Sequence, residues 1–216
     1  MDSDDDDVPQ LRADTLAALQ EFLQSRVDSE TQPSDNNSEN QERLFQKDLS
    51  ESFPEDWQMS QFWYDDHTSN TLAAEVLRLA GDKGNIACLS CPSIFRACRG
   101  AKNAFVFEYD RRFQAFGSSY IFYDYNHPEE IPEDCRSAYE VIIADPPFLS
   151  EECLTKLAEA VRLLQKADSK IILCTGAVMT ENAEKLLSLK KTKFEPHHKN
   201  NLGNEFACFA NYEMDL

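Results

Sequence analysis

The sequence predicts an α/β fold in which a mostly parallel β-sheet is covered by helices on both faces. Short, continuously apolar segments alternate with segments of helical periodicity over residues 57–216, which is typical of a parallel sheet buried on both sides. The last two β-type segments, 191–195 and 205–212, are joined by a polar loop too short for a helix. They should therefore form an antiparallel hairpin at one edge, which brings the expected sheet to seven strands.

Five strand–helix units lead up to this hairpin. Apolar residues at helical spacing predict helices at 69–79, 93–99, 110–116, 151–165 and 180–187. Runs of β-branched and aromatic residues predict strands at 85–90, 104–108, 120–123, 139–144 and 170–175. Asp110 stands at the start of the third helical segment, where its side chain is placed to cap the helix.

Residues 1–56 differ from the rest of the chain in charge. They hold 16 acidic and 4 basic residues, a net charge of −12 out of −18 for the whole chain. Leucines at helical spacing predict an amphipathic helix at about 11–24, and the almost purely polar segment 28–42 should be a mobile linker. We interpret this extension as a solvated tail with one docked helix, or as an acidic arm that steers a basic protein partner.

Composition limits the class of protein. The 216 residues suffice for one domain, 42% of them are hydrophobic, and no run of 18 apolar residues predicts a membrane span. An acidic start is unlike a signal peptide, and seven cysteines, an odd number, indicate reduced thiols. A net charge of −18 argues against extended nucleic-acid contacts. We expect a cytoplasmic monomer that binds neither DNA nor a membrane.

Fold geometry predicts where a ligand binds. In open α/β sheets the site lies beyond the carboxyl ends of the strands, which here means residues 90–93, 108–110, 124–126 and 145–148. Glu108 lies about 18 residues after the first strand, near the spacing of an acid that accepts hydrogen bonds from a nucleotide ribose. Asp110 is the competing acid, although it is also placed to cap a helix. Asp124 is either an acceptor for an adenine amino group or an ordinary turn residue.

The tetrapeptide from Asp145 to Phe148, Asp-Pro-Pro-Phe, is the most informative motif. Two prolines fix φ and remove two backbone donors, so the turn presents carbonyl oxygens, a carboxylate and an aromatic ring. Such a turn suits an amine substrate, which donates hydrogen bonds to oxygen and packs against the face of Phe148. The alternative interpretation is a plain turn that ends a strand.

Taken together, these segments resemble the elongation factor 1-alpha lysine methyltransferase 1 family, formerly labelled adenine-N6 methyltransferase-like. The resemblance covers about residues 54–212 and the predicted helix near 11–22, and is carried by the blocks at 60–64, 107–113, 122–126, 143–153, 174–177 and 201–206. It implies a Rossmann-like seven-strand methyltransferase sheet, S-adenosylmethionine as cofactor, and methyl transfer to a lysine of elongation factor 1-alpha.

The resemblance also implies a set of site residues. The expected catalytic residues are Asp145, Pro146 and Phe148. The expected cofactor-binding residues are Trp63, Tyr64, Ser90, Cys91, Ser93, Glu108, Asp110, Asp124, Tyr125 and Asp145. For Trp63 and Tyr64, simple core packing is the alternative.

The sequence departs from the general methyltransferase pattern in the loop after the first strand. This loop is Gly-rich in most such enzymes, whereas here its sequence is Ser-Cys-Pro-Ser. Pro92 removes a backbone donor, so we expect Ser90 and Ser93 to help hold the cofactor carboxylate. Cys88 and Cys91 would point to opposite faces of a strand, and the histidines lack paired ligand spacing, so no redox or metal site is expected.

Two other functions stay open at this point. The first is methylation of adenine in DNA, whose exocyclic amine fits the same motif; residues 57–216 carry a net charge of −6, which disfavours a DNA-binding surface. The second is a scaffold that has lost cofactor binding, which the Gly-poor loop favours and the intact acids disfavour.

Overall fold

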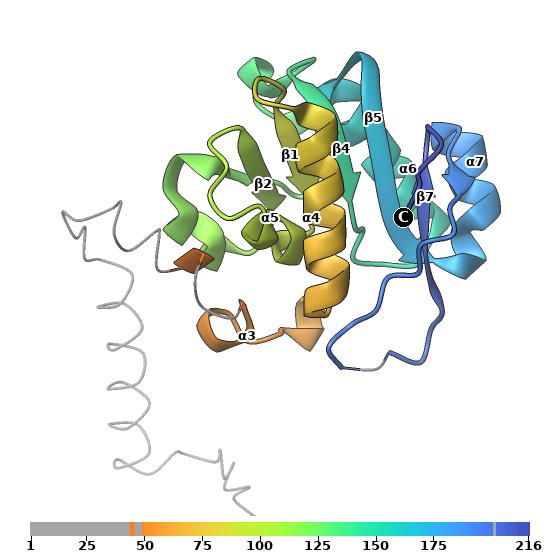
Figure 1. The fold of residues 1–216 in the computed structure, drawn as a ribbon, viewed down its shortest axis with the longest axis horizontal. Helices are drawn as coiled ribbons and strands as arrows, with labels where there is room; N and C mark the ends of the chain where they lie inside the picture. Colours follow the sequence, from red (N-terminus) through yellow and green to blue (C-terminus); the bar gives the residue numbers. More distant parts are fainter. Residues whose placement is uncertain (1–43, 46–48, 201) are drawn as a thin grey trace, which may run out of the picture. The chain divides into compact units, whose positions relative to one another are not determined.

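A computed structural model describes residues 44–45, 49–200 and 202–216 (Figure 1). The predicted helix at 11–24 and the linker at 28–42 lie outside these residues. The division of the chain at residue 56 stays a prediction. None of the helices described is long and apolar enough to cross a membrane.

The predicted seven-strand sheet is confirmed. The strand order is β3-β2-β1-β4-β5-β7-β6, in which the first five positions pair in parallel and β7 runs antiparallel to both neighbours. The hairpin therefore places β7 inside the sheet and β6 at its edge. The strands are β1 (Ile86–Leu89), β2 (Ala104–Glu108), β3 (Tyr120–Phe122), β4 (Tyr139–Ala144), β5 (Gln165–Gly176), β6 (Lys190–Lys191) and β7 (Phe206–Ala210).

Helices cover both faces of this sheet. Alternate strand residues separate into two cores: Ile86 and Cys88 pack with the cluster that includes α4 and α5, whereas Ala87 and Leu89 pack with the cluster that includes α6. Figure 1 shows α4 crossing in front of the strands and α6 behind them. The helices are α3 (Leu49–Ser52), α4 (Asp66–Ala80), α5 (Pro92–Ala97), α6 (Glu151–Leu164) and α7 (Thr180–Leu187), with 3₁₀ turns η1 (Trp57–Met59), η2 (Arg111–Ser119), η3 (Pro128–Glu130), η4 (Glu133–Cys135) and η5 (Ala177–Met179).

Several element boundaries differ from the predicted ones. Helix α4 begins at Asp66 rather than 69, because the Asp65 side chain caps it by accepting a hydrogen bond from the backbone N–H of Thr68 at 2.7 Å. The third helical segment is the 3₁₀ helix η2, and Asp110 caps it as expected. Strand β5 is longer than predicted, and β6 is only two residues long.

The segment before residue 57 contributes to the core on the α4 side. Leu49 and Phe53 are buried there, and the Phe53 ring lies 4.7 Å from that of Phe113. The Trp63 indole N–H donates a hydrogen bond to the Phe53 carbonyl at 2.9 Å. This segment and the residues that follow it are thereby attached to the sheet beside the ends of β1 and β2.

Candidate active site

A cavity of about 670 Å³ opens at the carboxyl ends of the parallel strands. Residues after β1, β2, β3 and β4 line it, as the fold geometry predicts, and two further segments complete its wall. One is the N-terminal strap, residues 58–65, of which 58–64 line the cavity. The other is the C-terminal loop, residues 192–200 and 202–205, which contributes His198 and residues 202–204, together with Phe206, the first residue of β7. The predicted site residues that line this cavity are Trp63, Tyr64, Ser90, Cys91, Ser93, Glu108, Asp124, Tyr125, Asp145, Pro146 and Phe148.

Backbone pairing joins the strap to the C-terminal loop. Tyr64 and His198 form an antiparallel bridge. On either side of it, the Asp65 N–H donates to the His197 carbonyl and the Lys199 N–H donates to the Trp63 carbonyl, each at 2.9 Å. Segments more than 130 residues apart in sequence thus form one continuous wall.

Glu108 closes β2 and is buried at the cavity wall. Its Oε1 accepts hydrogen bonds from the backbone N–H groups of Tyr109 and Asp110 at 3.2 and 3.3 Å, and neither of these bonds uses the second oxygen. Burial raises the pKa of Glu108 to about 7, against the opposing effect of these donors. Glu108 can therefore accept hydrogen bonds from ligand hydroxyls in a fixed orientation.

Asp145 directly follows β4, is half-buried as a residue, and lines the cavity. Its backbone N–H donates to the Leu89 carbonyl at 3.0 Å, which fixes the start of the Pro-Pro turn against β1. Burial, together with the charge of nearby Glu108, raises the pKa of Asp145 to about 8, against the opposing effect of the Tyr64 hydroxyl. A carboxyl with so few donors around it has a strong electrostatic preference for a cation.

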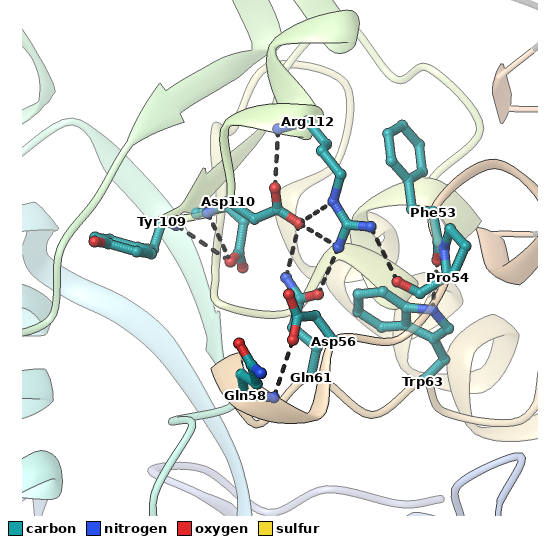
Figure 2. A network of polar contacts seen from close by, with 10 residues as sticks. Phe53, Pro54, Asp56, Gln58, Gln61, Trp63, Tyr109, Asp110 and Arg112 are labelled. Atoms are coloured by element: carbon teal, nitrogen blue, oxygen red, sulfur yellow. Dashed lines mark hydrogen bonds and ion pairs between the residues drawn. The ribbon is translucent and has the colours of Figure 1, made fainter. Parts of the chain in front are cut away.

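Asp110 does not line the cavity and is instead the centre of a polar network (Figure 2). It accepts hydrogen bonds from Arg112 Nε at 2.7 Å and from Gln61 Nε2 at 3.0 Å. Arg112 also donates to Gln61 Oε1 at 2.9 Å and to the Pro54 carbonyl at 3.1 Å. Although burial raises the pKa of Asp110, these donors lower it overall. The network fixes the strap to the end of β2, so Asp110 acts on the cavity through Gln61.

The loop after β1 is compact. Ser90 has φ of 52°, in the left-handed region that costs a non-glycine residue about 1 kcal/mol. Pro92 begins α5, and Ser90 and Ser93 both line the cavity. The Cys91 thiol contacts the Ile143 carbonyl at 3.4 Å, and burial raises its pKa to about 11. Because it stays protonated, the Cys91 thiol is unreactive and serves for packing.

Asp124 lies in the turn after β3. Its Oδ1 accepts a hydrogen bond from the Asn126 N–H at 2.8 Å, as a turn residue does, and the residue lines the cavity. The next residue, Tyr125, lies with its ring 5.7 Å from that of Phe148. Phe148 is 41% exposed, so these two rings stand where the cavity meets solvent.

Two buried hydroxyls in the cavity wall, those of Tyr64 and Tyr123, have no hydrogen-bond partner among the described residues. An unpaired buried hydroxyl costs about 1–3 kcal/mol, which a polar ligand would offset. Together with the acceptors at Glu108 and Asp124, this means that the cavity fits a polar nucleoside ligand. The described residues contain no group of three side chains placed to hold a metal ion.

Sequence reasoning missed His198 and Phe206 as site residues. The His198 ring lies 4.5 Å from the Tyr64 ring on one side and 4.5 Å from the Phe206 ring on the other. Burial lowers the pKa of His198 to about 4, so it is neutral at physiological pH. The sequence block at 201–206 contains Phe206, but nothing in its pattern indicates that it packs beside Tyr64.

Comparison with known proteins gives consistent matches over the whole site. A family model described as "Probable N6-adenine methyltransferase" matches residues 55–214, which include every residue that lines the cavity. The chain is 45% identical to "EEF1A lysine methyltransferase 1" of Mus musculus over 220 residues, covering 100% of this chain and 97% of that protein. It is 46% identical to the protein of the same name from Gallus gallus, with 100% of both chains covered. It is 43% identical to "Protein-lysine N-methyltransferase M142.8" of Caenorhabditis elegans, over 98% of this chain and 97% of that protein.

Proposed function

Because this chain belongs to the EEF1A lysine methyltransferase 1 family, we propose that it transfers methyl groups from S-adenosylmethionine to a lysine ε-amine of elongation factor 1-alpha. The observation that carries the proposal is the position of the Asp-Pro-Pro-Phe turn. At the carboxyl end of β4, the carboxylate of Asp145, the residue Pro146 and the ring of Phe148 line a single cavity.

We assign the side of the cavity near β1, β2 and β3 to the cofactor. Glu108 would accept hydrogen bonds from the ribose hydroxyls and Asp124 from the adenine amino group, with Tyr125 beside it. Ser90 and Ser93 would hold the carboxylate, and Trp63, Tyr64 and Cys91 would complete the wall. A cavity of about 670 Å³ is within the range of about 300–1,000 Å³ for sites of this kind. When bound, S-adenosylmethionine supplies a methyl group activated by positively charged sulfur.

We assign the side near β4 to the lysine. A lysine of pKa about 10.4 is only about 0.1% neutral near pH 7.4, a cost of about 4 kcal/mol. Asp145 would accept a hydrogen bond from the amine and orient it, and the Pro146 carbonyl would accept a second. Phe148 would pack against the amine at the rim. Desolvation in this pocket favours the neutral amine, and most of the acceleration would come from its orientation.

The substrate assignment also accounts for the charge of the chain. A translation factor that binds RNA should have basic surface, and the acidic extension at 1–56 would speed its encounter with this protein at low salt. We propose that the protein acts as a monomer in the cytoplasm, where translation takes place, and that it does not bind DNA.

Methylation of adenine in DNA is the second candidate. The description of the matching family model favours it, and the motif fits an exocyclic amine equally well. The net charge of −6 over residues 57–216 argues against it, because gripping a duplex requires clustered Lys and Arg.

The test uses elongation factor 1-alpha purified from cells that lack this protein. It is incubated with radiolabelled S-adenosylmethionine and the full chain, and the product is analysed by mass spectrometry. Label on one lysine, lost with Asp145→Ala and kept with the exposed turn variant Asp82→Asn, would support the proposal. Label that enters only DNA from a parallel reaction would favour the second candidate. Calorimetry that finds no cofactor binding would leave a scaffold.

A further inference from the structure

The side chain of Tyr64 has features that a place in the cofactor wall does not explain. It is 2% exposed, it lines the cavity, and its hydroxyl makes no hydrogen bond of ordinary length to a described residue, although it lies close enough to Asp145 to lower the pKa of that carboxyl. Like the Tyr123 hydroxyl in the same wall, a buried hydroxyl without a hydrogen bond indicates a position where a ligand group binds.

The hydroxyl lies near Asp145, which we assign to the lysine side of the cavity. The ionisable groups that act on it are Asp145 after β4, Cys174 on β5 and Cys91 after β1, and Glu108 is not among them. The influence is mutual, since the Tyr64 hydroxyl lowers the pKa of the Asp145 carboxyl. The hydroxyl therefore belongs with the carboxylate of the Asp-Pro-Pro-Phe turn and not with the ribose acceptor.

The ring that carries this hydroxyl is held from two directions. His198 stacks on it with centroids 4.5 Å apart, and Phe206 supports His198 from behind at 4.5 Å. The antiparallel bridge between Tyr64 and His198 fixes the two backbones. Because His198 is neutral, the stack brings no positive charge near an incoming ammonium group.

We propose that the Tyr64 hydroxyl directly contacts the substrate lysine, accepting an N–H of its amine while donating its own proton to Asp145, and that His198 is the positioning residue for the Tyr64 ring. This inference rests on the proposed function. It makes Tyr64 a catalytic residue beside Asp145 and the Pro146 carbonyl. The neutral amine has two N–H groups: one is donated to the Pro146 carbonyl and the other is shared between the Tyr64 hydroxyl and the Asp145 carboxylate, which leaves the nitrogen lone pair free for the methyl group.

The test is Tyr64→Phe, which keeps the ring and removes only the hydroxyl. We expect kcat on elongation factor 1-alpha to fall about 10-fold or more, the usual effect of one hydrogen bond to a charged group. The affinity for S-adenosylmethionine, measured by calorimetry, should stay within twofold. The matched control is Tyr120→Phe, which removes a buried unpaired hydroxyl outside the cavity wall and should leave kcat unchanged.

A second readout does not depend on turnover. In the protein without substrates, the pKa of Asp145 is measured by ¹³C NMR, with the signal assigned by its loss in Asp145→Asn. The groups that face this carboxyl are Tyr64, Glu108, Cys91 and Cys174. Loss of the hydroxyl should raise the pKa of Asp145, whereas Tyr120→Phe should not change it.

His198 is tested with a pair of variants. His198→Phe keeps a ring beside Tyr64 and should retain most of kcat. His198→Ala removes the ring and should lower kcat. Because both act through the Tyr64 hydroxyl, the double variant His198→Ala/Tyr64→Phe should lower kcat no further than Tyr64→Phe alone.

The outcomes separate the two levels of the proposal. A wild-type chain that does not methylate elongation factor 1-alpha contradicts the proposed function, and the NMR titration then still decides whether Tyr64 contacts Asp145. An active wild type with an equally active Tyr64→Phe variant contradicts the inference alone. If Tyr64→Phe lowers only the affinity for S-adenosylmethionine, Tyr64 contacts the cofactor and the inference is wrong.

Discussion

Glu108 and Asp145 are two carboxyl groups in one cavity wall, and they differ in the number of hydrogen-bond donors around them. Glu108 accepts two backbone N–H bonds and lies beside the network of Asp110, Gln61 and Arg112. For Asp145, the group that favours the ionised carboxylate is the Tyr64 hydroxyl. The pKa is raised to about 7 in the first and to about 8 in the second.

This difference indicates different tasks for similar groups. A carboxylate with fixed donors is already oriented before a ligand arrives, which suits recognition of ribose hydroxyls. A carboxyl that lacks donors is ionised most readily when a cation enters, which suits an ammonium group beside a sulfonium. Variants of each should therefore affect different steps of the reaction.

The largest effect is expected for Asp145→Asn. Loss of the charged acceptor should lower kcat at least about 100-fold, in the range for an oriented acid–base group. Because this residue lies on the lysine side, affinity for S-adenosylmethionine should change less than about threefold, or about 0.7 kcal/mol. Single-turnover methylation and calorimetry give the two numbers. A large loss of cofactor affinity with normal turnover at saturation would remove the distinction between the two carboxyls.

Glu108→Ala should show the opposite pattern. Removing a charged acceptor of two ligand hydroxyls costs about 1.5–3 kcal/mol, so the Kd for S-adenosylmethionine should rise about 10- to 100-fold. At saturating cofactor, kcat should stay within twofold of wild type. Glu108→Gln should lie between the two, because an amide oxygen still accepts one bond. An unaltered Kd in Glu108→Ala would contradict the ribose assignment.

Arg112→Ala tests the network that supports the Glu108 side, and a smaller effect is expected. The variant leaves Asp110 and Gln61 without their shared donor and releases the Pro54 carbonyl. We expect the Kd for the cofactor to rise about three- to tenfold and the free energy of unfolding to fall by about 1–2 kcal/mol. The neighbouring Arg111→Ala, which removes a cation–π contact with Phe122, should leave the Kd unchanged. Equal effects of both variants would mean a general loss of stability.

The smallest effect concerns protons. Both carboxyls have a raised pKa, so near pH 7.5 each is partly protonated, and a bound cation lowers both values. Binding of S-adenosylmethionine should thus release a fraction of a proton, measured by calorimetry in buffers of different ionisation enthalpy. S-adenosylhomocysteine, which lacks the sulfonium charge, should release less. The release should disappear above about pH 9, where both groups are ionised beforehand.

Sequence patterns predicted the parts of the site that are attached to the sheet. Ser90, Glu108, Asp124 and Asp145 follow strands whose apolar runs are unmistakable, and strand ends in a parallel sheet converge at one edge. The number of strands and the antiparallel last pair were predicted from the same patterns, whereas the order of the strands in the sheet was not.

The site residues that the sequence did not predict lie in segments without helical or strand periodicity. His198 lies in a polar loop and reaches the cavity through one isolated bridge to Tyr64, which leaves no alternation in the sequence. The role of Asp110 depended on which of two nearby acids points into the cavity, and spacing alone does not decide between neighbours two residues apart. Arg112, which holds Asp110, lies in a region that resembles an ordinary charged helix start.

The bridge between Tyr64 and His198 has a consequence for synthesis of the protein. The strap is made more than 130 residues before the loop that completes the cavity, so the two meet only after the strands from β1 to β6 have been made. Until then the ends of β1, β2 and β4 lack one wall, and β5 lacks its neighbour β7. A nascent chain therefore forms most of its sheet while the site is incomplete, and the cavity closes only when the loop after β6 has been made.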